Sequence, residues 1–500
     1  MTITSSSSNL PRERTAGWWD KLILALLVAL SAGGFLLASA INHHVGFPLD
    51  DSWIHQTYAR NLAQYGQWAF IPGVASGGST SPLWSVLLAI GYWVRLGPYA
   101  WTYLLGALSL WGLAVLAETS VRKILPAYSP RFPWVGATIA LEWHLVWASD
   151  SGMETLLQAL LVMAVLAMLI QGSHRYLILG LLVGVSVWVR PDGITLLGPA
   201  AFVILLTRQA WSGRLKGLGS LALGFACPFA LYLFFNLRIA GTPWPNTFYA
   251  KQAEYAIYLS APILLRYARE ALQPLTGAGL ILLPGLILAL VSSLRKKEWG
   301  VLAAVIWILG FLGLYAWRLP VTYQYGRYVM PVMPIYFLLG LIGLCDFVLG
   351  RGEGWRWMVK EFWRLLVGVV LACFWFLGAY SYSKDVAFIE NEMVTTARWV
   401  SENVPAGALV AAHDIGAMGY FGHHDLVDLA GLITPQVIPF IRDEAKISSY
   451  LDERNVNYLV VFPDWYPELT AGRQPIFITQ TVYAPDSGGS NMAVYRWPGP

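Results

Sequence analysis

Charged residues and cysteines are scarce in this chain of 500 residues. Only 12% of the residues are Asp, Glu, Lys or Arg and 56% are hydrophobic, which excludes an ordinary soluble domain. The three cysteines lie far apart within or beside apolar stretches, so the sequence predicts neither a disulfide framework nor a zinc site. The net charge of +4 comes from short loops rather than from a basic patch, which argues against nucleic-acid binding.

Hydrophobic stretches are abundant instead, and many are long enough to cross a membrane, which takes about 20 residues. The first is interpreted as a retained anchor rather than a signal peptide, because it is long and has no convincing cleavage site. The sequence therefore predicts a polytopic α-helical membrane protein. The stretches lie at 21–41, 81–97, 99–118, 133–149, 153–171, 176–190, 193–207, 216–238, 278–294, 299–316, 329–349 and 363–382.

The charges in the loops predict the topology. The positive-inside rule places four Lys- and Arg-containing loops in the cytoplasm, which leaves the C-terminal region outside. A cytoplasmic N-terminus then requires an odd number of crossings. The stretch 81–97 is the weakest, because Arg95 and Pro98 interrupt it. We expect about 11 crossings, and at most about 13, with 81–97 in the interface or joined to 99–118 as one broken element.

Three regions follow from this topology. Residues 1–20 are expected to form a disordered cytoplasmic N-terminus, and 21–383 a membrane domain with external loops at 42–80 and 239–277. Residues 384–500 have the mixed composition of a soluble external α/β domain. Apolar patterns predict strands and one helix in it. The strands lie at 408–414, 457–462 and near 476–483 and 492–497, and the helix lies at 444–454.

Asp50 and Asp51 form an adjacent pair of carboxylates just beyond the first hydrophobic stretch. Two like charges beside a low-dielectric region raise a pKa or require a cationic or metal partner, as in an enzyme that prepares a base. Helix capping is the alternative, but it needs only one Asp. We expect a catalytic role for at least one of the two. His55 would share a helix face with Asp51 and could orient a hydroxyl or a metal, or be a surface histidine.

Further polar residues fall on the same predicted external side. Glu154 follows a tight turn and could cap a helix or complete a metal or sugar-hydroxyl site. A turn is enough to account for the presence of Asp192 without a functional role, but it does not account for Arg190. A cation on this side could extend its charged end to the membrane surface, cap helix carbonyls or bind a lipid-linked phosphate. Of the three cations on this side, we expect two to hold such a phosphate between them. The three cations are Arg190, Lys251 and Arg327.

Two other segments hold candidate binding residues. The run from Gly241 to Lys251 is stiffened by prolines, and its aromatic residues are typical of membrane-interface anchors. Asn246 in this run is a candidate to hydrogen-bond a sugar or a phosphate. His413 and Asp414 follow the first strand of the C-terminal domain, where α/β sheets tend to carry ligand loops. They could contact an acceptor, or Asp414 could cap the next turn.

Several motifs, taken in their order along the chain, resemble the GT-C superfamily of polyprenyl-phosphate-sugar-dependent glycosyltransferases. Within it the chain is most similar to the arabinofuranosyltransferase AftB group. Each motif alone is weak, whereas their common order is fairly specific and spans about residues 20–430. The motifs are Asp50-Asp51 with Tyr58–Leu62, Gly78–Trp84, Ser151–Thr155, Arg190–Gly193, Pro245–Lys251 and Arg327–Pro331.

The resemblance implies a sugar donor on a polyprenyl phosphate, an acceptor hydroxyl on a glycan, lipid or protein, and an Asp of the first external loop as general base. That base is Asp50 or Asp51, with Asp51 preferred. Arabinofuranose is implied less strongly, because the wider group is broad in sugar and acceptor. The expected substrate-binding residues are His55, Glu154, Arg190, Asp192, Asn246, Tyr249, Lys251, Arg327, Tyr328, His413 and Asp414.

The resemblance also implies a cell-envelope enzyme in a bacterial plasma membrane, with its active site and C-terminal domain outside the cytoplasm. No cofactor is required, although a divalent cation (Mg, Mn or Ca) at Asp50, Asp51 and Glu154 would offset the repulsion between carboxylates. A transporter or flippase of lipid-linked sugars is the alternative. Transporters usually place their polar residues at the bilayer midplane and carry internal repeats, and no repeat is visible here.

Overall fold

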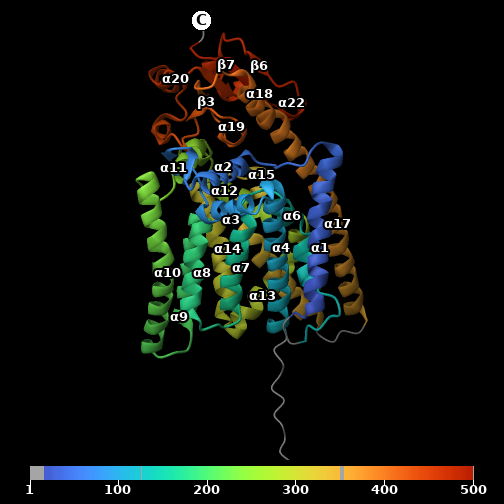
Figure 1. Ribbon diagram of the computed structural model, residues 1–500. Helices are drawn as coiled ribbons and strands as arrows, with labels where there is room; N and C mark the ends of the chain where they lie inside the picture. Colours follow the sequence, from blue (N-terminus) through green and yellow to red (C-terminus); the bar gives the residue numbers. More distant parts are fainter. Residues whose placement is uncertain (1–15, 126, 350–353, 499–500) are drawn as a thin grey trace, which may run out of the picture.

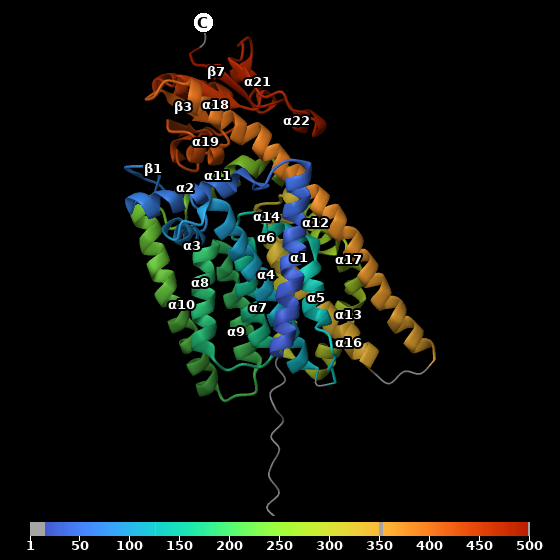
Figure 2. The same cartoon turned by 45° about the vertical axis from the view of Figure 1, so that its right-hand side comes forward.

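The computed structural model describes residues 16–125, 127–349 and 354–498. Its long helices stand side by side, and a small sheet with its own helices lies beyond one end of them (Figure 1). Between the long helices and the sheet lies a band of short helices, which a second view shows as well (Figure 2). The expected N-terminal tail, 1–20, lies mostly outside the described residues.

Seven stretches of the described chain are helical, long and apolar enough to cross a membrane, so the chain is a multi-pass membrane protein. The expected total of about 11 crossings would also require the shorter apolar helices, and it stays a prediction. The long stretches are α1 (Trp18–Asn42), α4 (Gly97–Ile124), α10 (Trp211–Ala240), α13 (Ala278–Lys296), α14 (Trp299–Arg318), Tyr323–Cys345 through α15 (Tyr323–Gly326) into α16 (Met333–Leu349), and Trp357–Asn403 through α17 (Trp355–Phe388) to α18 (Thr395–Asn403). The shorter helices include α7 (Thr155–Ile170), α8 (Tyr176–Val189) and α9 (Leu197–Leu206).

The stretch 81–97, expected not to cross, forms the short helix α3 (Pro82–Trp93). Its 12 residues rise only about 18 Å, against about 30 Å for the apolar core of a bilayer. Left-handed backbone at Arg95 and Gly97, with φ of 61° and 65°, separates α3 from α4. The two helices are therefore distinct elements rather than one continuous rod.

The predicted stretch 133–149 is also divided, into α5 (Trp134–Leu141) and α6 (Trp143–Ser149). Glu142, between them, has extended backbone, and its carboxylate accepts the Leu145 amide at 3.0 Å. A side chain that caps the second helix in this way offers the backbone an alternative to continuing the first one. The apolar composition of the segment does not reveal this break.

The two predicted external loops contain helices. The loop 42–80 holds α2 (Asp50–Tyr65) and a small hairpin of β1 (Ala69–Ile71) and β2 (Val74–Ala75). Both acids of the Asp50-Asp51 pair lie in the first turn of α2, where the helix dipole favours negative charge. The loop 239–277 holds α11 (Asn246–Glu254) and α12 (Ile263–Leu272). These helices bring residues from distant parts of the sequence into one band.

The C-terminal region is built on a five-stranded mixed sheet with the strand order β4-β3-β5-β7-β6. β3 is parallel to β4 and β5, whereas β7 is antiparallel to β5 and β6. The four predicted strands appear as β3 (Leu409–Ala412), β5 (Tyr458–Val461), β6 (Phe477–Ile478) and β7 (Ala493–Arg496), and the predicted helix as α20 (Glu444–Glu453). β4 (Asp425–Asp428) and α19 (Ile415–Phe421) were not predicted.

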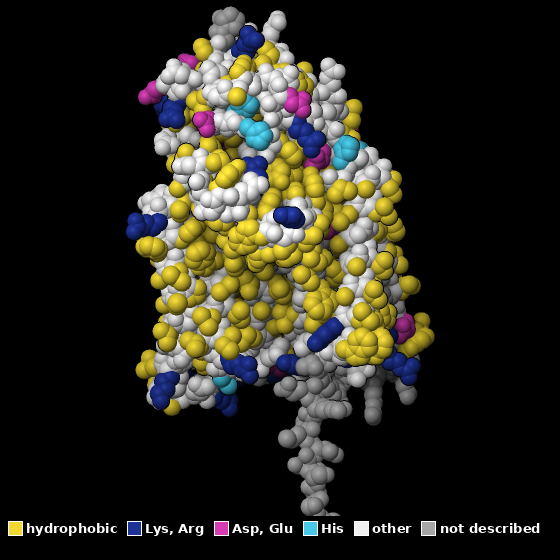
Figure 3. Space-filling view, viewed as in Figure 1, with side chains coloured by type: hydrophobic (Ala, Val, Ile, Leu, Met, Phe, Trp, Pro, Cys, Tyr) yellow, Lys and Arg dark blue, Asp and Glu magenta, His cyan; other side chains and the backbone are white. Residues whose placement is uncertain are grey.

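The surface of the helical part is apolar. Hydrophobic side chains cover the middle of the face seen in Figure 3, and most Lys and Arg side chains lie above or below them. Large hydrophobic residues on α1 and α10 are more than half exposed, such as Leu30 (71%) and Leu223 (69%). A continuous apolar surface of this kind is suited to lipid rather than to water.

Candidate active site

Two cavities meet in the band of short helices. The helix-side cavity, of about 340 Å³, lies between α2, α7, α11, α14 and the turn that begins at Arg190. The sheet-side cavity, of about 760 Å³, lies between α2, α11 and the ends of β3 and β5. One layer of side chains, the shared wall, lines both of them. Its residues are Asp51, Ile54, Lys251, Arg327 and Leu432.

Asp51 lies in this shared wall and pairs with both of its cations. Its Oδ2 atom accepts Lys251 Nζ at 3.1 Å and Arg327 Nη2 at 2.6 Å, and both cations also donate to the Tyr328 hydroxyl. Burial alone would raise the pKa of Asp51, but the charges of Lys251 and Arg327 outweigh it and hold the pKa well below its usual range. Lys251 and Arg327, two predicted site residues from distant segments, thus meet at the Asp51 carboxylate.

Asp50 faces the sheet region instead. Its two oxygens each accept one backbone amide, from Gly416 and Ala417, at 2.7 Å, so it caps the first turn of α19. Burial raises the pKa of Asp50 to about 7, and the two amides oppose this rise. A Cβ atom at Gly416 would lie 2.0 Å from the Asp50 carbonyl oxygen, so the close approach needs glycine. The capping alternative concerned the helix that the two acids begin, whereas Asp50 caps a different helix, α19.

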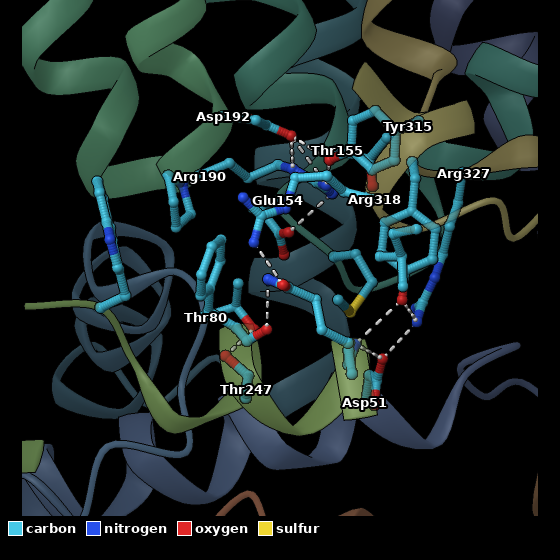
Figure 4. A pocket seen from close by; sticks show the side chains of 18 of the residues that line it. Asp51, Thr80, Glu154, Thr155, Arg190, Asp192, Thr247, Tyr315, Arg318 and Arg327 are labelled. Atoms are coloured by element: carbon cyan, nitrogen blue, oxygen red, sulfur yellow. Dashed lines mark hydrogen bonds and ion pairs between the residues drawn. The ribbon is translucent and has the colours of Figure 1, made fainter. Parts of the chain in front are cut away.

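Arg190 lies in a second polar network, on the far side of the helix-side cavity (Figure 4). Its Nε and Nη2 atoms are both 3.1 Å from Asp192 Oδ2, and its Nη1 atom is 3.5 Å from Glu154 Oε1. Tyr315 accepts a hydrogen bond from Arg190 at 2.7 Å and donates one to Asp192. Two carboxylates therefore balance the charge of Arg190 before any ligand arrives.

His55 connects α2 with this second network. Its Nε2 atom lies 3.5 Å from Glu154 Oε2, and its Nδ1 atom lies 3.0 Å from Ser85 Oγ on α3. The side chain is 3% exposed, so it is a buried histidine rather than a surface one. Burial lowers the pKa of His55, and nearby Glu154 opposes this effect. His55 also lines the helix-side cavity, beside Asp51.

Two cations of the helix-side cavity can still bind an anion. Arg318, at the C-terminal end of α14, is exposed, and its Nη2 atom donates a hydrogen bond to the neutral Gln252 side chain at 2.5 Å. No described carboxylate lies within ion-pair distance of Arg318. Arg327 Nε and Nη1 are buried without a hydrogen-bond partner among the described residues. Figure 4 shows both side chains at this pocket.

The sheet-side cavity combines carboxylates with aromatic rings. His413 lies 3.3 Å from Glu254 of α11 through Nε2, and its Nδ1 atom is 2.7 Å from the Tyr466 hydroxyl. Asp414 lines the same cavity, and its buried Oδ2 atom has no partner among the described residues. Trp465 and Tyr258, which also line it, are 48% and 47% exposed. Exposed rings beside carboxylates suit the apolar faces and the hydroxyl groups of a sugar.

Asn246 and Tyr249 were also expected at the site, but neither lines the two cavities. The Asn246 side chain donates to the Leu432 carbonyl at 3.2 Å, and the Tyr249 ring packs edge-on against Phe248. Asn246 begins α11, whose next turns carry Thr247 and Lys251 into the helix-side cavity. Its contacts are therefore those of a residue that fixes the course of the chain.

The carboxylates named as possible metal ligands do not gather at one point. Asp50 is bound to amides of α19, Asp51 to two cations, and Glu154 to Arg190 and His55. Within the described parts of the chain, no group of three His, Cys, Asp or Glu residues is placed to hold a metal ion. The set Asp50, Asp51 and Glu154 is thus not assembled, because each member already has a different partner.

The arrangement of long helices, short helices and a terminal sheet around these cavities is a GT-C-like fold. ArnT from Cupriavidus metallidurans shares it: its apo structure matches with a TM-score of 0.58 and 15% identity, over 95% of this chain and 97% of that one. ArnT bound to undecaprenyl phosphate gives 0.54 and 16%, over 95% and 98%. The apo oligosaccharyltransferase of Archaeoglobus fulgidus gives 0.54 and 12%, over 90% and 70%. At these identities the likeness shows the fold alone.

Sequence comparisons are less informative than the fold. A family model described as "Domain of unknown function (DUF8728)" matches residues 384–495, which run from the end of α17 through the sheet. No curated protein sequence matches the chain. The similarity to the solved structures confirms the GT-C-like fold that the sequence resemblance implied, whereas the likeness to the AftB group stays a prediction.

Tyr315, Arg318 and Glu254 are among the cavity residues to which the sequence did not point. Tyr315 and Arg318 lie at the end of a long apolar helix, where an aromatic residue and a cation are usual interface anchors. Glu254 ends a helix that was expected to be a loop. The position of Arg318, on the same predicted side as Arg190, was the signal that could have included it.

Proposed function

We propose that this chain is a membrane glycosyltransferase that moves a sugar from a polyprenyl-phosphate donor to a hydroxyl of an acceptor outside the cytoplasm. The acceptor is a glycan, lipid or protein of the cell envelope, and the sugar is a pentofuranose such as arabinofuranose. The observation that carries this proposal is the position of Asp51, in a wall between two cavities of unlike lining.

The helix-side cavity suits the donor. It has more cations than carboxylates, and it adjoins the apolar helices where a lipid tail would lie. ArnT from Cupriavidus metallidurans, which has this fold, has been solved with undecaprenyl phosphate, and this supports a lipid phosphate as the ligand here. The cations are Arg190, Lys251, Arg318 and Arg327, and the carboxylates are Asp51, Glu154 and Asp192.

The sheet-side cavity suits the acceptor. Its aromatic rings and carboxylates would hold a sugar chain so that one hydroxyl points toward the shared wall. Asp51 takes the proton of this hydroxyl as its oxygen attacks the anomeric carbon of the donor. The bond between that carbon and the phosphate oxygen breaks, and Lys251, Arg318 and Arg327 stabilise the negative charge left on the phosphate.

A transfer assay with purified full-length protein tests this function. A panel of polyprenyl-phosphate sugars is offered with cell-envelope glycans, each with and without EDTA so that a need for a divalent cation is scored separately. The Asp51→Asn variant should lose about 100-fold or more in transfer rate, as expected when a general base is removed. Full transfer by Asp51→Asn would contradict the mechanism, and lipid-sugar transport without transfer would favour a flippase.

A further inference from the structure

A single oxygen of Asp51 holds both cations of the shared wall. Lys251 Nζ and Arg327 Nη2 lie 3.1 Å and 2.6 Å from Asp51 Oδ2, and the three side chains are 24% exposed or less. At this depth the ion pairs are only partly screened by water. The carboxylate that would take the acceptor's proton is thus engaged by two charges that would hold the donor's phosphate.

Both cations also face the space where that phosphate would lie. Lys251 and Arg327 line the helix-side cavity, and Arg327 keeps two buried N–H positions, Nε and Nη1, without a partner among the described residues. A guanidinium binds a phosphate through two parallel N–H groups, either Nε with Nη2 or Nη1 with Nη2, so a two-point contact from Arg327 requires the Nη2 group that Asp51 holds. Arg318 adds a third positive charge to the cavity.

We propose that the donor's phosphate and Asp51 compete for Lys251 and Arg327, so that donor binding releases Asp51 to act as the base. This inference rests on the proposed function. In the free enzyme Asp51 is held by two charges and is a weak base. When the phosphate takes these charges, the same carboxylate gains affinity for a proton. Base strength is therefore coupled to occupancy of the donor site, and the donor must bind before the acceptor reacts.

During one turnover, Lys251 and Arg327 move their pairing from Asp51 to the donor's phosphate and back again. The acceptor O–H bond breaks and its proton moves to Asp51, while the acceptor oxygen bonds to the anomeric carbon and the electron pair of the broken bond stays on the phosphate oxygen. The donor is a phosphodiester with one negative charge, whereas the product is a phosphomonoester with a charge of about −1.5 to −2 at neutral pH. When this product leaves, Asp51 loses its proton to water and pairs again with the two cations.

Equilibrium binding of undecaprenyl phosphate, which carries no sugar, tests the competition without any transfer. The purified full chain is compared with Asp51→Asn, which removes the competing charge and keeps the size of the side chain. We expect Asp51→Asn to bind the lipid about tenfold more tightly than the wild type, because a carboxylate no longer occupies the cations. Asp425→Asn, an exposed position outside both cavities, is the control and should bind as the wild type does.

Two further variants make the result independent of a single substitution. Asp51→Ser also lacks the charge and should tighten binding, whereas Lys251→Gln removes a cation and should weaken it several-fold. Unchanged or weaker binding by both folded Asp51 variants would overturn the competition. If those variants also fail to transfer sugar, the proposed function stands and only this inference falls. If they transfer sugar normally, Asp51 is not the base, and the proposed function itself falls only if the wild type transfers no sugar from any donor of the panel.

Discussion

Replacing Asp50 tests whether this carboxylate holds the sheet region on α2 rather than taking part in the chemistry. Each of its oxygens accepts one buried backbone amide at 2.7 Å, from Gly416 and Ala417. A hydrogen bond to a charged group contributes about 1.5–3 kcal/mol, and Asp50→Ala removes two and leaves two buried amides unpaired. Because the contributions of neighbouring hydrogen bonds are not additive, we expect Asp50→Ala to lower the free energy of local unfolding at α19 by about 2–4 kcal/mol.

Other contacts should keep α19 near α2 in this variant. Arg60 of α2 donates to the Tyr420 and Gly419 carbonyls at 2.6 and 3.2 Å, and Trp53 packs on the Tyr420 ring. Asp50 and Arg60 thus hold opposite ends of α19, each with the charge that the helix dipole favours there. The loss of local stability in Asp50→Ala should therefore be confined to the first turn of α19 and the neighbouring loop at His413 and Asp414.

Amide hydrogen exchange measures this effect directly. At about 1.4 kcal/mol per factor of ten, peptides that contain Gly416 and Ala417 should exchange at least tenfold faster in Asp50→Ala. Peptides from α14 should be unchanged, and Asp425→Ala serves as the surface control. Transfer should persist with a raised KM for the acceptor. Normal exchange together with complete loss of transfer would refute the docking role and make Asp50 a chemical participant.

Three more predictions address the wall and the cavities. Lys251→Gln should move the acid limb of kcat/KM to higher pH, because the charge of Lys251 helps to hold the pKa of Asp51 low. The ion pairs of Asp51 are present above the ordinary Asp pKa and are lost as the pH falls through the pKa of the folded state. An unmoved limb would mean that Lys251 does not set this pKa. Arg318→Gln should raise the KM for the donor about tenfold with little change in kcat, measured against Arg238→Gln, an exposed cation outside both cavities; equal KM values for the two variants would exclude Arg318 from phosphate binding. Glu254→Gln weakens the contact with His413 and should raise the KM for the acceptor several-fold while undecaprenyl phosphate binding stays unchanged; a change in lipid binding instead would place Glu254 on the donor side.

The membrane part of the fold was readable from the sequence because apolar length is a strong local signal. α1, α4 and α10 lie where hydrophobic stretches predicted helices. The breaks within such stretches were less visible. Glu142 divides 133–149 through one side-chain contact to a backbone amide, and composition does not register a single contact of this kind.

The members of the site were partly predictable, but their pairing was not. Asp51, Lys251 and Arg327 were named because charges beside apolar stretches need a reason, and they meet in the structure. Adjacency could not separate Asp50 from Asp51, since both begin the same helix. Their difference arises from α19, a helix of seven residues some 365 positions further along the chain, whose amides reach only one of the two.

The shared wall also bears on how such a protein could be inhibited. A lipid phosphate and a water-soluble sugar chain prefer different solvents, so an ordinary competitor reaches only one of the two cavities. Asp51, Lys251 and Arg327 line both cavities. On the proposed function, a molecule that joins a lipid-borne phosphonate to a short glycan would displace both substrates at once, and its affinity would gain from the high effective concentration of the second half.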